Sequence, residues 1–483
     1  MKILYYNWVP FDDDENRGGG VSVYQRNLIS YLLKQSDNEV YFISSGIAYT
    51  AESKGVYIKR TSNIYGKRCK TYQIINSPIL SPGHCAFDDM DIYLNDLELY
   101  QIFKKFITQN GPFDVIHFNN FEGLSLHVLK IKEDFPNTKM IYSLHNYYAF
   151  CPQVNLWKKE RESCYDFHDG KDCLTCLTYK ADKQEVLFAN KLAYKLKICH
   201  FNSHTAVYRL AFRYAYYLRK WSQYINKYIR KIEEPRKCFK ICSSHYKLYR
   251  EKNIEFLNTY IDTILCVSER VREIAIKMGI MPEKAITDYI GTVVAENQAS
   301  YECTPIDTPI FTILFMGYMR KDKGFFFLLK ALKEVSPEIS INIRVVIAAK
   351  ISDQRLIEQF RKLGKHYYEI DIYDGYSHKE LDKLFNGVNL GIIPVLWEDN
   401  LPQVAIEMVS RGVPILTSDK GGAHELCNDP LFIFESNNKA EFVEKLEHLY
   451  LNRSDLKCFW HKKMPLTTFK EHIEKLKLFY RYN

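Results

Sequence analysis

Strands and helices alternate regularly in the second half of the chain, and this alternation limits the possible folds more than any other feature. Short apolar runs of strand length are separated by segments whose apolar residues recur at helical spacing. This order is typical of a parallel sheet covered by helices on both faces, so we predict a Rossmann-like α/β domain. The predicted strands are 311–317, 341–348, 368–373, 390–396 and 414–418, and the predicted helices are 324–335, 353–363, 378–386 and 401–411.

The first half of the chain repeats the alternation less regularly, which indicates a second Rossmann-like domain. Residues 2–7 predict a strand, a glycine-rich loop follows at 17–20, and residues 21–33 predict a helix. Further strands are predicted at 39–44, 114–119, 139–145 and 263–268. We predict an N-terminal domain from 1–149 and 261–300, a helical insertion at 150–260, a C-terminal domain at 301–465, and a final helix in 466–483 that returns to the N-terminal domain.

Composition restricts the compartment. Hydrophobic residues make up 46% of the chain and charged residues 26%, as in soluble globular proteins. No apolar run approaches the roughly 20 residues of a membrane span, and the N-terminus turns acidic too soon for a secretory signal. The 13 Cys are odd in number and scattered, which suits reduced thiols. We therefore expect a cytoplasmic protein.

The segment 397–407 carries the residues most suited to chemistry. Asp399 lies in a loop after an apolar strand, and Glu407 lies two turns into the following helix, with seven residues between them. A loop carboxylate can accept hydrogen bonds from sugar hydroxyls, and a carboxylate on the helix can bind the ribose of a nucleotide. The free amides at the helix start, near Leu401 and Gln403, suit a diphosphate. A second glycine-rich turn follows at 418–425, where glycine permits close backbone approach.

The stretch WEDNLPQVAIEMVSRGVPILTSDKGGAHE resembles the core of the retaining glycosyltransferase family 4, which has the GT-B fold. That family shows an acid, seven residues, a Glu, and later a Gly-Gly…Glu turn. The resemblance covers most of 1–146 and 260–449 and is weaker in the insertion. It implies an α/β protein of two Rossmann-like domains that transfers a sugar from a nucleotide-diphosphate sugar with retention at the anomeric carbon.

The resemblance also implies roles for particular residues. It puts Lys323 on the donor diphosphate, Gly19 and Gly20 near the donor phosphates and acceptor, and His145 near the reacting sugar. Two positions depart from the family. Tyr318 stands where an Arg is usual, so Arg320 is the expected substitute; the first acid is Asp399 instead of Glu, unless Glu398 takes that role. The full expected site comprises catalytic His145, Asp399 and Glu407; phosphate-binding Lys323, Arg320, Gly19, Gly20, Leu401 and Gln403; and nucleotide- or sugar-binding Glu398, Asn400, Glu407, Gly421 and Gly422.

The resemblance implies a reaction that requires no metal or other cofactor. Lys323, Arg320 and the helix start would meet the charge on the leaving diphosphate, which itself helps deprotonate the acceptor. The expected acceptor is a glycan or lipid-linked glycan of surface polysaccharide synthesis. Two alternatives remain: a nucleotide-sugar epimerase, which needs no acceptor, and a degenerate transferase that serves as a non-catalytic binding subunit.

Four cysteines gather in the insertion, namely Cys151, Cys164, Cys173 and Cys176. Four thiolates can hold Zn²⁺ tetrahedrally, and the Cys-x-x-Cys pair supplies two ligands from one turn. The first two cysteines lack that close spacing, so a structural zinc and four free thiols are both open interpretations.

The insertion also holds the basic excess of the chain. Residues 177–250 carry 17 Lys and Arg against 4 Asp and Glu, whereas the whole chain has a net charge of +8. Residues 205–232 predict an amphipathic helix with an apolar stripe and a basic opposite face. This helix either lies on an anionic membrane, with the protein peripheral at the inner face of the plasma membrane, or packs its stripe on the first domain. Nucleic acid is the poorer explanation, because no recognition module accompanies the patch.

Overall fold

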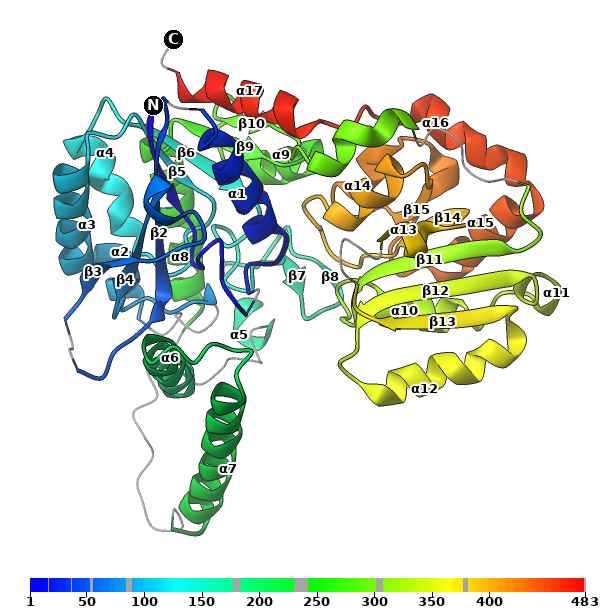
Figure 1. The fold of residues 1–483 in the computed structure, drawn as a ribbon, viewed down its shortest axis with the longest axis horizontal. Helices are drawn as coiled ribbons and strands as arrows, with labels where there is room; N and C mark the ends of the chain where they lie inside the picture. The colour runs from blue at the N-terminus through cyan, green and yellow to red at the C-terminus, as the bar shows by residue number, and fades with distance from the viewer. Residues whose placement is uncertain are drawn as a thin grey trace.

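Two α/β domains lie side by side, and the chain's last helix crosses from the second back to the first (Figure 1). The computed structural model describes residues 1–15, 17–35, 37–52, 55–83, 89–176, 183–229, 242–300, 307–376 and 381–481. The predicted fold class, two Rossmann-like domains with a helical, cysteine-containing insertion in the first, is confirmed.

The N-terminal domain is built on an eight-stranded sheet in the order β10-β9-β6-β5-β1-β2-β4-β3. All its strand pairs are parallel except β3 with β4. Apolar side chains on both faces of the central strands are buried, which is why helices cover both faces. The strands are β1 (Lys2–Tyr6), β2 (Glu39–Ala48), β3 (Tyr57–Thr61), β4 (Cys69–Ile75), β5 (Val115–Phe118), β6 (Lys139–Leu144), β9 (Thr263–Cys266) and β10 (Ala285–Thr287).

The C-terminal domain has a six-stranded, all-parallel sheet in the order β13-β12-β11-β14-β15-β16. The chain order reverses beside β11, so the loops after β11 and β14 meet at the carboxyl edge, where open parallel sheets bind ligands. The strands are β11 (Phe311–Tyr318), β12 (Ile343–Lys350), β13 (Glu369–Asp374), β14 (Leu390–Ile393), β15 (Ile415–Ser418) and β16 (Ile433–Phe434).

The helices connect these strands and build the insertion. Those of the N-terminal domain are α1 (Gly19–Leu32), α2 (Met90–Asn95), α3 (Leu97–Asn110), α4 (Ile131–Asp134) and α9 (Glu269–Lys277). The insertion holds the hairpin β7 (Trp157–Lys158) and β8 (Glu162–Ser163) and the helices α5 (Cys173–Cys176), α6 (Lys183–Ile198), α7 (Ala206–Ile229) and α8 (Ser243–Tyr260). The second domain and the tail hold α10 (Phe325–Ala331), α11 (Pro337–Ser340), α12 (Gln354–Leu363), α13 (Leu381–Phe385), α14 (Gln403–Ser410), α15 (Lys439–Leu451), α16 (Cys458–Lys462) and α17 (Phe469–Tyr480).

Helix α17 is anchored in the N-terminal domain by buried polar contacts. The Tyr480 hydroxyl lies 2.9 Å from the Tyr5 hydroxyl and 2.6 Å from His117 Nδ1. His472 Nε2 lies 2.8 Å from the Tyr24 hydroxyl. The two domains are therefore connected twice, by the chain between β10 and β11 and by α17.

Several helix boundaries differ from the predictions; α10, for example, ends at Ala331 and not at residue 335. Helix α14 begins at Gln403, not at residue 401, because Pro402 is its extended N-cap (φ −67°, ψ 123°) and a proline disfavours helical backbone before it. The predicted helix 378–386 is seen as α13, and residues 377–380 lie outside the described residues. Likewise, residues 230–232 of the predicted basic helix lie outside them.

Candidate functional site

The loop after β14 and the start of α14 form the centre of the candidate site. Lys323, in the loop after β11, reaches Asp399, with 2.5 Å between Nζ and Oδ2. Its ammonium also lies 5.3 Å from the centre of the Trp397 ring. The structure thus brings together the lysine and the loop acid that the sequence predicted separately for phosphate and sugar.

Glycine at 324 allows this approach of the two loops. Gly324 has φ +73°, and a Cβ added there would lie 1.7 Å from the Pro394 carbonyl oxygen. Any other residue would push the loop after β11 away from the loop after β14. The position of Lys323 is therefore set by backbone contact.

Glu407 lies on α14 and is 8% exposed. Burial is the main cause of a raised pKa of Tyr376, and the negative charge of Glu407 adds to it, which puts the two side chains in one neighbourhood. Tyr318, 52% exposed at the end of β11, raises the same pKa further. Tyr376 thus lies near the carboxylate predicted to bind ribose.

The glycine loop of the N-terminal domain faces the start of α14. Gln403 Nε2 donates to the Gly20 carbonyl oxygen at 3.1 Å. A Cβ on Gly20 would lie 3.2 Å from Gln403 Cδ, and Gly19 has φ +52°. Gly20 therefore meets the C-terminal domain at the amide end of α14, whereas the space beside Gly19 is open.

His145 lies directly after β6, at the edge of the N-terminal sheet. Its Nε2 lies 3.1 Å from Asn119 Oδ1. Burial, with repulsion from His472, lowers the pKa of His145 to about 3, so the imidazole is neutral at pH 7. A neutral imidazole can exchange hydrogen bonds with a sugar hydroxyl but carries no charge.

Glu398 closes the interface between the domains. Arg270 of α9 binds it with both Nε and Nη2, at 2.9 and 3.0 Å. Ser163 Oγ at 3.1 Å, the Tyr165 hydroxyl and the Gly421 amide at 3.0 Å also donate to its oxygens. Burial opposes ionisation, but these contacts hold the pKa of Glu398 at about 2. They correct the expectation that Glu398 binds the donor, since protein groups occupy both of its oxygens.

Glu425 makes a second link across the domains. Its carboxylate accepts from the Glu269 and Arg270 amides, at 3.0 and 2.7 Å, and from the Tyr289 hydroxyl at 2.7 Å. A carboxylate at the first amides of α9 is stabilised by the helix dipole. We call Glu398, Glu425, Arg270, Ser163 and Tyr165 the interdomain clasp.

The Gly421–Gly422 turn supports the loop of Asp399. A Cβ on Gly421 would lie 1.9 Å from the Asp399 carbonyl oxygen, and the Gly422 amide donates to that oxygen at 2.8 Å. Asn400 Nδ2 donates to the Leu144 carbonyl oxygen at 3.1 Å. Gly421, Gly422 and Asn400 therefore help to hold the loop and the interface, and their contact with the donor stays a prediction.

Arg320 is engaged by Asp322. Its Nε and Nη2 donate to the two carboxylate oxygens, at 2.9 and 2.6 Å, in a bidentate pair. Its side chain is 58% exposed, and its contact with the donor phosphates stays a prediction. Leu401 is 6% exposed and packs in the core beside α14.

Sequence reasoning missed the clasp residues Arg270, Ser163 and Tyr165. Their partner, Glu398, is 128 residues from Arg270 along the chain, so no local spacing connects them. The one available signal was Ser268 before Glu269, a serine at a helix start, which does cap α9 through the Val271 amide at 3.2 Å.

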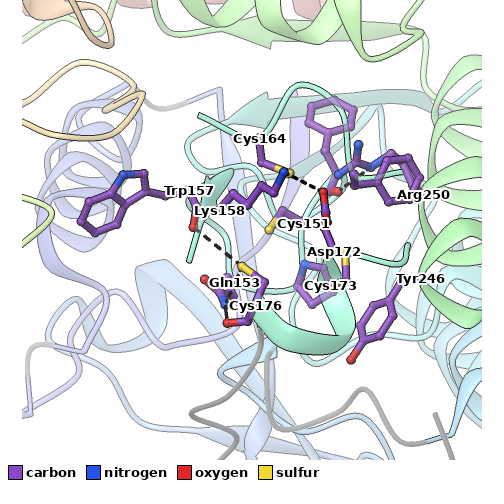
Figure 2. A pocket seen from close by; sticks show the side chains of 13 residues that line it. Cys151, Gln153, Trp157, Lys158, Cys164, Asp172, Cys173, Cys176, Tyr246 and Arg250 are labelled. Carbon is purple, nitrogen blue, oxygen red and sulfur yellow. Dashed lines mark hydrogen bonds and ion pairs between the residues drawn. The ribbon is translucent and has the colours of Figure 1, made fainter. Parts of the chain in front are cut away.

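The four insertion cysteines surround one small cavity between the β7–β8 hairpin, α5 and α8 (Figure 2). All four are free thiols. Within the described part of the chain, three metal-ligating atoms come within 4.8 Å of one another only at Asp13, Asp14 and Glu15. The four sulfurs therefore share a cavity but are not drawn together as in a metal centre.

Sequence comparison with known proteins finds a family match in the C-terminal domain. The family model "Glycosyl transferases group 1" matches residues 302–460. Spore coat protein SA of Bacillus subtilis (strain 168) is 25% identical over 145 residues, which are 28% of this chain. The chain matches only 38% of that relative's length.

Solved structures resemble the whole chain at low sequence identity. Sucrose-phosphate synthase of Thermosynechococcus elongatus gives a TM-score of 0.58 at 12% identity, over 100% of this chain and 98% of that one. A glycosyltransferase of Rickettsia africae gives a TM-score of 0.56 at 13% identity, over 99% of this chain and 97% of that one. Anabaena HepE in complex with UDP gives a TM-score of 0.54 at 14% identity, over 99% of this chain and 100% of that one. The chain therefore has a GT-B fold, and its residues 302–460 match the glycosyltransferase group 1 family model.

Proposed function

We propose that this protein transfers a sugar from a nucleotide-diphosphate sugar, the donor, to a glycan or lipid-linked glycan acceptor in surface polysaccharide synthesis. One observation carries the proposal: Lys323 pairs with Asp399 just before α14, the helix that carries Glu407, and the first residue of α14, Gln403, donates to Gly20 of the other domain. HepE, solved with UDP and with UDP-glucose, supports a uridine diphosphate sugar as the first donor to test.

The chemistry follows from the charges at this edge. Lys323 stands 2.5 Å from Asp399 and is only 23% exposed, so its charge acts where water is partly excluded. The diphosphate gains negative charge as the sugar leaves, and Lys323 with the amides of α14 stabilises it. Asp399 holds a hydroxyl of the transferred sugar, and Glu407 holds the ribose. The leaving phosphate takes the proton of the acceptor hydroxyl, and transfer retains the anomeric configuration without a metal.

The direct test measures donor turnover with and without an acceptor. The purified chain is incubated with UDP-sugars, and UDP release and sugar isomers are measured in EDTA, Mg²⁺ and Mn²⁺. We expect UDP release only with an acceptor and independent of divalent cations. Isomerised sugar without an acceptor contradicts transfer and identifies an epimerase, and activity restored only by Mg²⁺ or Mn²⁺ contradicts the metal-free reaction.

A donor-binding subunit without turnover is the second candidate. Tyr318 stands at the position where the family has an Arg, and Arg320 is held by Asp322. Tight UDP-sugar binding, measured by calorimetry, without turnover on a broad acceptor panel supports this candidate against the first.

We also propose that α7 binds an anionic membrane surface. The helix projects away from the N-terminal domain (Figure 1), and its apolar stripe is exposed: Leu210 is 51% exposed, Leu218 62% and Trp221 65%. The alternative, in which this stripe packs on the first domain, is wrong for these residues. An exposed apolar stripe edged by Arg and Lys is typical of a helix lying in the headgroup region of an anionic leaflet. Within the described residues, no helix is long and apolar enough to cross a membrane.

A further inference from the structure

A cavity of about 20 Å³ lies in the insertion, which is room for one water-sized body. Its lining includes Cys151, Cys164, Cys173 and Cys176, contributed by three different segments of the insertion (Figure 2). Four reduced thiols around one ion-sized cavity make up the ligand set of a structural zinc.

A buried cation, the guanidinium of Arg250, lines the same cavity. Arg250 of α8 is 7% exposed, donates from Nε to the Phe150 carbonyl oxygen at 3.0 Å, and lies 3.6 Å from the centre of the Phe167 ring. In the part of the chain that the structure describes, no carboxylate pairs with it. A zinc ion held by four thiolates carries a net charge of about −2, which a buried guanidinium neutralises. Lys158, which also lines the cavity, forms an ion pair with Asp172 at 2.7 Å.

We infer that Cys151, Cys164, Cys173 and Cys176 bind one zinc ion, with Arg250 as the compensating cation. Binding draws the sulfurs to roughly 3.8 Å from one another, as expected for tetrahedral zinc with Zn–S distances of about 2.3 Å. Each thiol loses its proton to solvent as its sulfur binds the ion.

The zinc site adjoins the interdomain clasp. Cys164 stands between Ser163 and Tyr165, and both neighbours donate to Glu398 of the other domain. Glu160, in the same hairpin, pairs with Lys321 at 3.3 Å. Fixing Cys164 to a metal therefore orders the hairpin residues that hold the two domains together.

The test is the metal content of the full chain, purified without a chelator. We expect about one zinc per chain by mass spectrometry, and after cobalt exchange a thiolate-to-cobalt absorption band typical of tetrahedral sulfur ligation. Cys164→Ser and Cys173→Ser should reduce bound zinc more than tenfold, whereas Cys199→Ser, an exposed cysteine away from the cavity, should keep it.

The wild-type measurement decides the inference even when a variant fails to fold. Wild-type protein without bound metal, whose four cavity thiols react with a thiol reagent and release none, overturns it. Iron with inorganic sulfide in place of zinc overturns it as well. Neither result bears on donor transfer, since the cavity does not include Lys323, Asp399 or Glu407.

Discussion

At the residue scale, two acids that are adjacent in sequence have different partners. Glu398 is fully buried and accepts hydrogen bonds from four protein side chains and backbone groups. Asp399 instead pairs with Lys323 of the loop after β11. We therefore expect Asp399, and not Glu398, to contact the proposed donor.

Lys323→Ala removes the cation nearest the proposed diphosphate. We expect kcat to fall roughly 100- to 1,000-fold, because the charge of the leaving group then lacks a preorganised partner. Steady-state kinetics with UDP-sugar and acceptor measures the change. The matched control is Lys321→Ala, two residues earlier, whose ammonium pairs with Glu160 on the insertion. Equal losses for both lysines, or full activity of Lys323→Ala, contradict the assignment.

The spacing of Asp399 and Glu407 was readable from the sequence because one loop and one helix carry both. The contacts of Glu398 could not be predicted from the sequence, because Arg270, Ser163 and Tyr165 come from distant segments. The neutral state of His145 was equally hidden, because burial by the surrounding chain sets its pKa.

At the element scale, local pattern predicted the central strands but missed part of the edges. Strand β3 (YIKRT) has no apolar run and lies at the sheet edge, half exposed, so periodicity does not reveal it. Helix α14 was predicted two residues early, because Pro402 acts as its cap. Buried parallel strands are easily recognised in the sequence, because both of their faces are apolar.

The clasp between α9 and the loop after β14 predicts a pH-dependent stability. Glu398 ionises more readily in the folded chain, with a pKa of about 2 against an ordinary 4.5. Its contribution is therefore complete above about pH 4.5 and is lost as the pH falls toward 2. Glu398→Gln should cost roughly 3–5 kcal/mol at pH 7, as expected when one partner of a buried ion pair is removed.

Thermal unfolding at pH 7 and pH 3 measures this effect. The midpoint of Glu398→Gln should lie below that of the wild type at pH 7, and the difference should shrink at pH 3. Glu334→Gln, which removes a surface pair with Lys439, is the control and should change the midpoint little. A Glu398 effect that is the same at both pH values speaks against the ion pair as its cause.

The exposed stripe of α7 predicts vesicle binding. Wild-type protein should co-sediment with vesicles of anionic phosphatidylglycerol more than with neutral phosphatidylcholine. The double variant Leu218→Glu, Trp221→Glu should lose this binding, since it places charge on the face that enters the headgroup region. Leu478→Glu, at a leucine on α17 that is 63% exposed, is the control and should bind as the wild type does. Wild-type self-association without vesicle binding contradicts the membrane assignment.

At the scale of the whole molecule, the candidate site depends on contacts that fix the two domains relative to each other. Gln403 reaches Gly20, Asn400 reaches Leu144, and α17 fastens the end of the chain to the first sheet. The alternation of strands and helices predicted the two domains, but not the contacts that face them toward each other. Such contacts join residues hundreds of positions apart, which a single sequence does not relate.

The most direct test is a crystal structure with UDP-glucose and, in parallel, with GDP-mannose. We expect the diphosphate against the amides of Gln403 and Val404 and beside Lys323, with the ribose at Glu407 and the sugar at Asp399 facing Gly20. A nucleotide sugar bound elsewhere, with this edge of the C-terminal sheet empty, would contradict the proposed donor site.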